Sequence, residues 1–233
     1  MGKKHLGRKT KIMKRLHIIC EGHTEELFVN KLLIPSMQAK GVLITPSQIG
    51  KPGHKGGNVN YNRLLFDVKN RVLSDKNCYC TILLDYYGLP SDFPGKQDST
   101  KYRSSLEKHN AITKALQKKM EVDIKEASKR FIPYIQLHEF EGLLFSSPNS
   151  ITKILQQPNL LIEFEKIQKK YETPEDINDS PETAPSKRIQ ALHKEYDKPL
   201  HPVLIAEDIG LDMIREKCPL FNSWVNRLEE LGN

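Results

Sequence analysis

The sequence predicts an α/β protein in which a small, mainly parallel sheet is flanked by helices and followed by a helical C-terminal portion. Two observations support this fold class. Apolar runs typical of strands alternate with segments whose apolar residues recur at helical spacing. The run CYCTILL at 78–84 is apolar almost throughout, as in a strand that is covered on both faces of a parallel sheet.

The first predicted strand covers 14–20 (KRLHIIC), and the chain then turns sharply at Gly22 into a helix. Thr24 is a plausible N-cap for this helix, because leucine and phenylalanine residues recur at helical spacing after it. A second strand is predicted at 41–49. A basic, glycine-rich loop, KPGHKGG at 51–57, comes next and lacks the ending of a phosphate-binding Walker motif.

Apolar residues at helical spacing predict a helix over 61–73, before the central strand at 78–84. A mostly polar helix follows at 103–120. The run FIPYIQL at 131–137 is the last predicted strand, and Pro133 within it favours an edge position because proline cannot donate to a strand ladder. Beyond residue 150 the pattern is helical, and short helices are predicted at 189–196, 208–217 and 221–231.

The 233 residues suit one domain with an extension. We expect a basic tail at 1–13, a core at 14–146, and a helical extension packed on that core at 147–233. Residues 1–15 carry seven lysines and arginines and no acid, whereas the remainder has 29 basic and 29 acidic residues. The net charge of +7 therefore comes from the tail, which could add affinity for nucleic acid or merely aid solubility.

Acidic residues follow three of the predicted strands. Glu21, Asp85 and Glu139 come at these ends, Glu25 lies in the first turn of the following helix, and Glu141 is two residues past Glu139. Parallel strands would bring these acids to one sheet edge, where α/β proteins place their functional crevice. Converging carboxylates repel unless a cation compensates, and hard oxygen ligands suit Mg²⁺ or Mn²⁺. Such an ion can activate water and stabilise charge on a phosphodiester.

Each acid also has a purely structural interpretation. Glu25 could simply favour the helix dipole, and Asp85 could cap the turn that follows it. Glu139 and Glu141 could be solvated loop residues. The coincidence at three strand ends favours a metal site over these separate explanations.

Several basic residues are candidates for contact with an anionic substrate. His138 adjoins the acids and could act as general acid, contact phosphate or only support the site. Lys198 could stabilise a developing oxyanion or be a solvated charge of a helix. Lys51 and Lys55 in the glycine-rich loop could face phosphates, or the loop could be a plain connection. Two further residues, Lys187 and Arg188, could meet a phosphate backbone or be solvated charges of a helix.

The stretch IICEGHTE at 18–25 resembles the Toprim signature, in which an apolar strand is followed by Glu-Gly and by an acid on the next helix. Asp85 resembles the first aspartate of the Toprim Asp-x-Asp motif. Three narrower motifs, DYYGLP at 85–90, HEFEGLLF at 138–145 and CPLFNSW at 218–224, resemble a bacterial family of Toprim-like proteins, domain of unknown function 4276. The resemblance runs from about residue 14 to residue 231.

The resemblance implies a Toprim-like fold with a magnesium site. In the related overcoming-lysogenization-defect (OLD) nucleases, acids at these places bind two metals and cleave nucleic acid. Carried over, Glu21, Glu25 and Asp85 would be metal ligands or general base, and Glu139 or Glu141 could complete a second site. Family members are similar to proteins encoded beside ABC- or AAA-type ATPases in phage-defence settings.

One residue departs from the Toprim pattern. Tyr87 stands where the motif has its second aspartate. A phenol with an ordinary pKa of about 10 is a poor magnesium ligand at neutral pH. A standard two-metal mechanism would therefore need Glu139 and Glu141 to compensate.

The first functional hypothesis is a Mg²⁺- or Mn²⁺-dependent nuclease that acts on DNA or RNA, as the effector of a phage-defence system. The alternative is a non-catalytic regulatory or binding partner of an ABC- or AAA-type ATPase, and a third is an enzyme for a small phosphorylated substrate. The four cysteines lack CxxC spacing, and no apolar run approaches the about 18 residues of a membrane helix. These features predict a cytoplasmic location.

Overall fold

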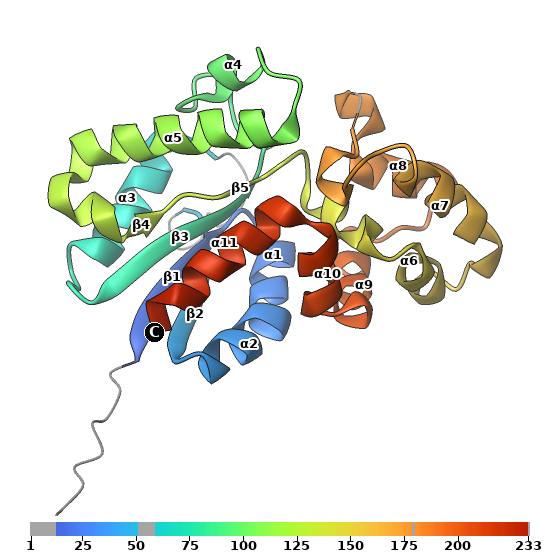
Figure 1. Cartoon of the computed structure of the whole chain (residues 1–233), viewed down its shortest axis with the longest axis horizontal. Coiled ribbons are helices and arrows are strands. Elements are labelled where there is room, and N and C mark those ends of the chain that lie inside the picture. The colour runs from blue at the N-terminus through green and yellow to red at the C-terminus, as the bar shows by residue number, and fades with distance from the viewer. Residues whose placement is uncertain (1–12, 51–58, 179, 233) are drawn as a thin grey trace, which may run out of the picture.

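The computed structural model describes residues 13–50, 59–178 and 180–232 (Figure 1). The two most apolar runs form the centre of its sheet, as β1 (Lys14–Cys20) and β3 (Cys78–Asp85). Every pairing is parallel, and the order is β2-β1-β3-β4, with β5 also paired to β3. The remaining strands are β2 (Val42–Gln48), β4 (Phe131–Ile132) and β5 (Ile135–Gln136). The predicted small parallel sheet is therefore confirmed.

Two hydrophobic cores cover the two faces of the sheet, because successive strand residues point to opposite sides. Ile19 and Ile82 belong to the core that packs under α3 (Tyr61–Val72) and α5 (Ser105–Ile124). Ile18 faces the other core. Figure 1 shows that α1, α2 and α11 cover that second face. These helices span His23–Phe28, Ile34–Ala39 and Pro219–Glu229.

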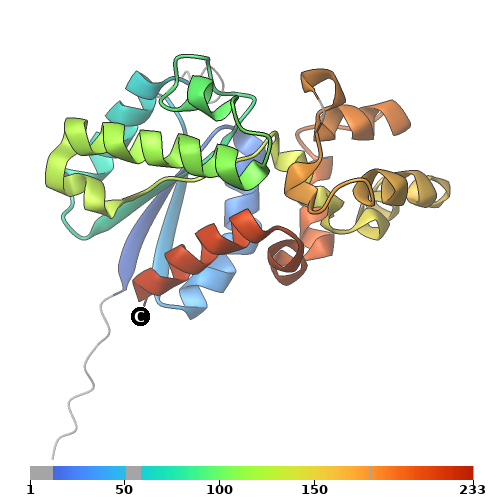
Figure 2. The same ribbon diagram turned by 45° about the horizontal axis from the view of Figure 1, so that its top comes forward.

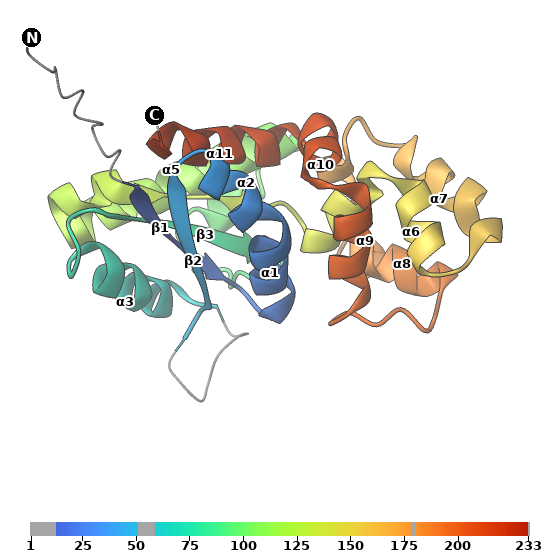
Figure 3. The same ribbon diagram turned by 90° about the horizontal axis from the view of Figure 1, so that it is seen from below.

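The helices between the sheet and α11 form a group beside the sheet rather than over it, as the views in Figures 2 and 3 show. They are α6 (Pro148–Ile154), α7 (Leu161–Gln168), α8 (Pro185–Leu192), α9 (His201–Ile209) and α10 (Leu211–Lys217). A short α4 (Lys96–Ser99) precedes α5. No helix in the described ranges is long and apolar enough to cross a bilayer.

The last helix, α11, returns from this lateral group to the sheet. The indole Nε1 of Trp224 donates a hydrogen bond of 2.9 Å to Oγ1 of Thr81 on β3, and this hydroxyl donates to the carbonyl of Ile132 on β4. Phe221 and Val225 are fully buried in the same core. The C-terminal end of the chain therefore completes the hydrophobic core of the sheet.

The structure corrects three sequence-based expectations of local structure. The strand predicted at 131–137 is two short strands separated at Pro133, which has no N–H for a continuous ladder. The helix predicted at 208–217 is divided between α9 and α10 at Gly210, whose φ of 79° is left-handed. Helix α1 begins at His23 rather than after Thr24, because the Glu25 carboxylate caps the amide of Gly22.

Both outer strands of the described sheet contain or adjoin a proline. Pro46 lies within β2, paired with Ile18 of β1, and Pro133 lies between β4 and β5. These are positions where the missing N–H of proline costs the sheet least, since one side of an edge strand has no neighbour. The predicted edge position of Pro133 is thus confirmed.

Candidate metal centre

Two acids predicted to meet, Glu21 and Asp85, lie at adjacent ends of the central strands. Glu21 directly follows β1, and its backbone N–H donates to the carbonyl of Leu83 on β3 at 3.0 Å. Its carboxylate Oε2 accepts a hydrogen bond of 2.9 Å from the backbone N–H of Asp85. The parallel pairing of β1 and β3 therefore brings both side chains to one place, as strand ends of a shared sheet require.

The carboxylate of Glu21 rests directly against the backbone of Gly88. A Cβ on Gly88 would lie 2.6 Å from Oε2 of Glu21 and 2.8 Å from its Cδ. The φ of Gly88 is not in the left-handed region, so the constraint at this position is space and not backbone conformation. A side chain at this position would force the carboxylate of Glu21 to shift.

Glu25 reaches the same place from the first turn of α1. Its Oε2 accepts a hydrogen bond of 2.9 Å from the backbone N–H of Gly22, and the residue is 7% exposed. This carboxylate also benefits from the positive end of the helix dipole. The structural role foreseen for Glu25 is therefore real, and it places the carboxylate beside the other acids.

Two more acids come from the segment after β5, a strand that pairs with the end of β3. The backbone N–H of Tyr87 donates to the carbonyl of His138 at 3.1 Å, so the two strand ends stay together. Oε1 of Glu139 and Oε1 of Glu141 lie 3.6 and 3.7 Å from the ammonium Nζ of Lys198. Lys198, in the connection between α8 and α9, is the cation of this acidic site.

A cavity of about 330 Å³ lies where these segments meet. Five charged side chains line it, namely Glu21, Glu25, Asp85, Glu141 and Lys198. Glu139 does not line the cavity but pairs with Lys198 from its edge, and its Oε2 accepts a hydrogen bond from the Ser186 amide at 3.0 Å. Four of the five acids expected at one sheet edge therefore line one cavity.

Burial and mutual repulsion make these carboxylates unusually reluctant to ionise. Burial raises the pKa of Glu21 and of Glu141 to about 7, against the opposing charge of Lys198. Burial also raises the pKa of Glu25, and it raises that of Asp85 well above the usual range, with further contributions from Glu21, Glu25 and Glu141. Without a cation these carboxyls therefore tend to keep their protons, and a bound cation would compensate their charge and allow them to ionise.

The donor set fits a hard divalent cation such as Mg²⁺ or Mn²⁺. Every candidate ligand is a carboxylate oxygen, and Oδ1 of Asp85 is buried with no hydrogen-bond partner among the described residues. Within those residues, however, no three His, Cys, Asp or Glu side chains are arranged closely enough to hold an ion together. Magnesium commonly keeps several waters and takes only one or two protein carboxylates, which this arrangement can supply.

His138 lies apart from the acids, although it precedes Glu139 in the sequence. Its ring packs against Tyr86 and Tyr87, with centroids 6.3 and 5.5 Å away, and its φ of 65° is left-handed. Burial, with Lys108 and Lys96, lowers the pKa of His138 to about 4. The imidazole is therefore neutral at pH 7 and does not line the acidic cavity, and its catalytic role stays a prediction.

Tyr87 stands where the sequence resemblance expects the second aspartate of the Toprim motif. Burial raises the pKa of its phenol to about 12, with smaller contributions from Glu139 and other neighbours. The phenol is therefore protonated at neutral pH and offers no anionic ligand. That Glu139 or Glu141 replaces the missing carboxylate stays a prediction.

The other predicted phosphate contacts are not brought to the acids. Arg188 donates from Nε to the carbonyl of Thr183 at 2.7 Å and from Nη2 to the hydroxyl of Tyr171 at 2.6 Å. Lys187 extends to Gln190 on its own helix. Neither residue lines the acidic cavity, and Lys51 and Lys55 lie outside the described residues.

Sequence reasoning missed Gly88 and the backbone N–H of Asp85, which together position Glu21. Gly88 was visible in the DYYGLP motif, but only as a turn residue. A contact between this glycine and Glu21, 67 residues earlier in the chain, has no periodicity that a sequence pattern could reveal.

The fold and the site together define an α/β protein with an acidic cavity at the carboxyl edge of a parallel sheet. The comparisons place it further. A family model described as "Domain of unknown function (DUF4276)" matches residues 20–229, so the chain belongs to this family, and the relation expected from its motifs is confirmed. No curated protein matches the chain significantly.

Two solved structures are similar to the chain. One is the C-terminal region of the Burkholderia pseudomallei OLD protein, with 14% sequence identity and a TM-score of 0.48 over 94% of this chain and 99% of that one. The other is the C-terminal region of the Xanthomonas campestris pv. campestris OLD protein, with 15% identity and a TM-score of 0.44 over 93% and 95% of the two chains. Both are regions of the OLD proteins named by the sequence resemblance.

Proposed function

We propose that this protein is a metal-dependent phosphoryl-transfer enzyme, a nuclease that cleaves DNA or RNA with Mg²⁺ or Mn²⁺. The observation that carries the proposal is the meeting of Glu21 and Asp85 across β1 and β3, within a cavity that Glu25 and Glu141 also line. Carboxylates on separate segments, held close at a free energy cost, are suited to binding a divalent cation.

Each residue of the site has a proposed role that follows from its position. Glu21 and Asp85 would hold the metal, and Glu25 would orient a water molecule or share a second ion. Glu139 and Glu141 fix Lys198 at the cavity, where its ammonium can face a negative phosphate oxygen. A bound divalent ion supplies the Lewis acid and the activated water that phosphodiester hydrolysis requires.

Cleavage assays with end-labelled single-stranded DNA, duplex DNA and RNA test the proposal, with Mn²⁺, Mg²⁺ or EDTA. We expect metal-dependent cleavage that falls about 100-fold or more in Glu21→Gln and in Asp85→Asn, because both remove ligand charge. Glu163→Gln, at an exposed acid on α7, is the matched control and should leave cleavage unchanged.

A thermal-unfolding arm separates metal binding from catalysis. Mn²⁺ should raise the unfolding temperature of the wild type and of Glu163→Gln, but not of the Glu21→Gln/Asp85→Asn double variant, because only an intact site binds the ion in the native state. Cleavage at the wild-type rate in both single variants would remove the assignment.

One observation favours a second function, a non-catalytic partner of an ABC- or AAA-type ATPase in phage defence. Tyr87 replaces a carboxylate of the Toprim motif and stays protonated. Under this alternative, the chain co-purifies with such an ATPase encoded nearby, and Asp85→Asn leaves both the complex and the ATPase rate unchanged. Cleavage by the chain alone would argue against it.

A further inference from the structure

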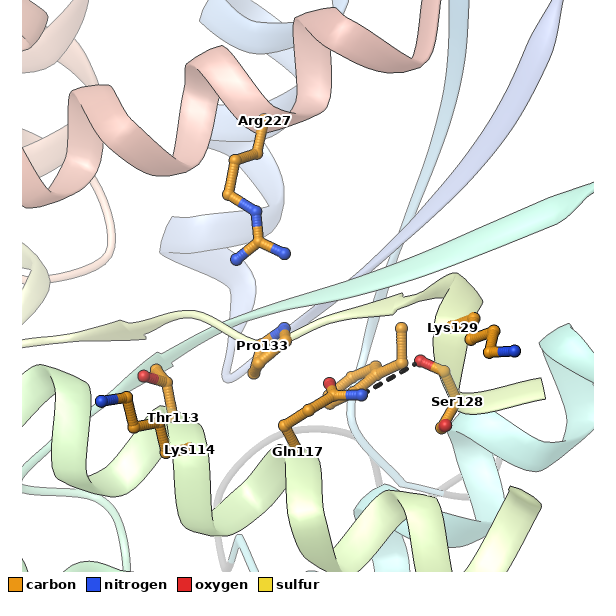
Figure 4. A pocket seen from close by; sticks show the side chains of 8 residues that line it. Thr113, Lys114, Gln117, Ser128, Lys129, Pro133 and Arg227 are labelled. Atoms are coloured by element: carbon orange, nitrogen blue, oxygen red, sulfur yellow. Dashed lines mark hydrogen bonds between the residues drawn. The ribbon is translucent and has the colours of Figure 1, made fainter. Parts of the chain in front are cut away.

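Two neighbouring cavities lie away from the acidic site, along the β4 edge of the sheet between α5 and α11. Their volumes are about 370 and 200 Å³, and both are lined by Thr113, Pro133 and Arg227. Figure 4 shows the larger cavity, with Arg227 extending from α11 toward Pro133. Gln117 lies on α5, on the opposite side of the cavity. Since no lining residue is shared with the acidic cavity, the two sites are separate.

The charge of these cavities is opposite to that of the acidic site. Lys114, Lys129 and Arg227 line them, and no aspartate or glutamate does. Lys129 is neutralised by Glu126 at 2.6 Å. Neither Lys114 nor Arg227 forms an ion pair with an acid of the described chain. The planar guanidinium of Arg227 is thus available to an anion, and it suits phosphate geometry.

Two residues that line the cavities, Gln117 and His109, also have buried polar atoms without partners. Oε1 of Gln117 and both ring nitrogens of His109 are buried without a hydrogen bond to any described residue. The Gln117 amide is oriented, because its Nε2 donates to the carbonyl of Ser128 at 3.3 Å. Its oxygen therefore needs a donor, while a neutral histidine offers one donor and one acceptor. Leaving buried polar atoms unpaired costs free energy that a ligand or water would recover.

The neighbourhood of His109 keeps it in this neutral form. Burial, together with the charge of Arg227, lowers its pKa to about 4. Its ring packs on Tyr134 at 5.5 Å, and Tyr134 stacks on Trp224 at 4.5 Å. The larger cavity therefore holds the two lysines and Gln117, the smaller one holds His109 with Tyr134 and Trp224, and Arg227 lines both.

We propose that these paired cavities bind a small phosphorylated ligand of nucleotide type. Arg227 and Lys114 would take the phosphate, and Gln117 and His109 would take the donors and acceptors of the base or sugar. The larger cavity falls in the size range of small-molecule sites, about 300–1,000 Å³. The proposal goes beyond the nuclease function and does not depend on it, because the two sites share no residue.

The single tryptophan of the chain provides a local probe of this site. Trp224 lines the smaller cavity and is the only tryptophan in the sequence. The full-length protein is titrated with AMP, GMP, CMP, UMP or inorganic phosphate to millimolar concentration, by tryptophan fluorescence and by calorimetry. We expect a saturable response to at least one nucleotide, weakened about tenfold in Arg227→Gln because a charge-assisted contact is lost.

Two comparisons make the result specific. Lys114→Gln should also weaken binding, whereas Lys118→Gln, at an exposed lysine one turn along α5 that does not line either cavity, should not. Unchanged unfolding temperatures show that the variants remain folded. The Asp85→Asn variant should bind the nucleotide as the wild type does, so failure of this inference and failure of the nuclease proposal are distinguishable.

Three outcomes overturn the inference. One is the absence of any response to all five probes by both methods. Another is equal affinity in the wild type and Arg227→Gln. The third is binding of a short single-stranded oligonucleotide, lost in Arg227→Gln, without binding of any mononucleotide, since that would assign the cations to a nucleic-acid strand.

Discussion

At the scale of single residues, the acidic site depends on a contact between a side chain and a glycine. The backbone N–H of Asp85 holds the carboxylate of Glu21, which occupies the space that a Cβ on Gly88 would take. A shift of this carboxylate away from Gly88 would disturb its hydrogen bond to the Asp85 amide. Preorganisation of this kind keeps a ligand within the small tolerance that catalysis demands.

Gly88→Ala tests this arrangement. The added methyl group would lie 2.6 Å from Oε2 of Glu21, so the carboxylate must shift. We expect metal-dependent cleavage to fall about 100-fold and the free energy of unfolding to fall by about 1–3 kcal/mol. Cleavage assays and urea unfolding measure the two effects.

Gly142→Ala is the control for this substitution, because a Cβ there would make an ordinary contact of 3.4 Å with the carbonyl of Pro174. It should retain cleavage and stability. If Gly88→Ala cleaves as well as Gly142→Ala does, Glu21 needs no such close support.

The sequence predicted that Glu21, Asp85 and Glu141 lie close together, but not which contacts position each of them. Glu21, Asp85 and Glu141 were predictable because strand ends and their flanking residues gather at one edge of a parallel sheet. The position of His138 was not predictable. Its place beside Glu139 in the sequence does not indicate the left-handed φ or the packing of its ring against Tyr86 and Tyr87. Contacts set by backbone turns carry no periodic pattern.

At the scale of elements, one buried acid joins the lateral helical group to α11. Glu175 is 1% exposed, and its two carboxylate oxygens accept hydrogen bonds of 2.8 Å from the backbone N–H groups of Leu220 and Phe221. These amides are at the first turn of α11, where N–H groups lack partners within the helix. Glu175 therefore caps this helix from a distant segment.

The cap makes stability depend on pH. Burial raises the pKa of Glu175 from 4.5 to about 7, although the two amides oppose this. The native state therefore binds a proton that the unfolded chain has released, so this contribution to stability is complete below pH 4.5 and is lost as pH rises to about 7. Between pH 4.5 and 8 the free energy of unfolding of Glu175→Gln should therefore fall by about 1–3 kcal/mol less than that of the wild type.

Urea unfolding across this pH range measures the effect for wild type and Glu175→Gln. Glu165→Gln, at a surface acid of α7 paired with Lys169, serves as the control and should follow the wild-type curve. Parallel curves for wild type and Glu175→Gln would show that this carboxyl has no raised pKa.

At the scale of the whole molecule, the last helix completes a sheet that the first half of the chain begins. The strands β1 and β3 were predictable because their apolar runs are continuous. The position of α11 was not predictable, because a short amphipathic helix can pack on many apolar surfaces and its sequence does not indicate which one. The hydrogen bond of Trp224 to Thr81 and the burial of Phe221 and Val225 show where its apolar side packs.

The coupling between α11 and the sheet can be measured. Trp224→Phe and Thr81→Val each remove the hydrogen bond of 2.9 Å between them, and each should reduce the free energy of unfolding by about 1–3 kcal/mol. In the double variant the losses should not add, because both substitutions delete the same interaction. Urea unfolding followed by circular dichroism gives the four free energies.

Strict additivity in this double-mutant cycle would show that α11 and β3 do not depend on each other. Thr113→Val, at a hydroxyl that bonds only to carbonyls of its own helix α5, is the matched single control and should be nearly neutral.

The prolines of the two outer strands also affect how separate molecules meet. Pro46 in β2 and Pro133 between β4 and β5 each remove an N–H from a border where another chain could add a strand. A sheet that is interrupted at both borders is a poor template for the growth of fibrils. The described sheet therefore offers fewer backbone donors at both borders for a strand added by another molecule.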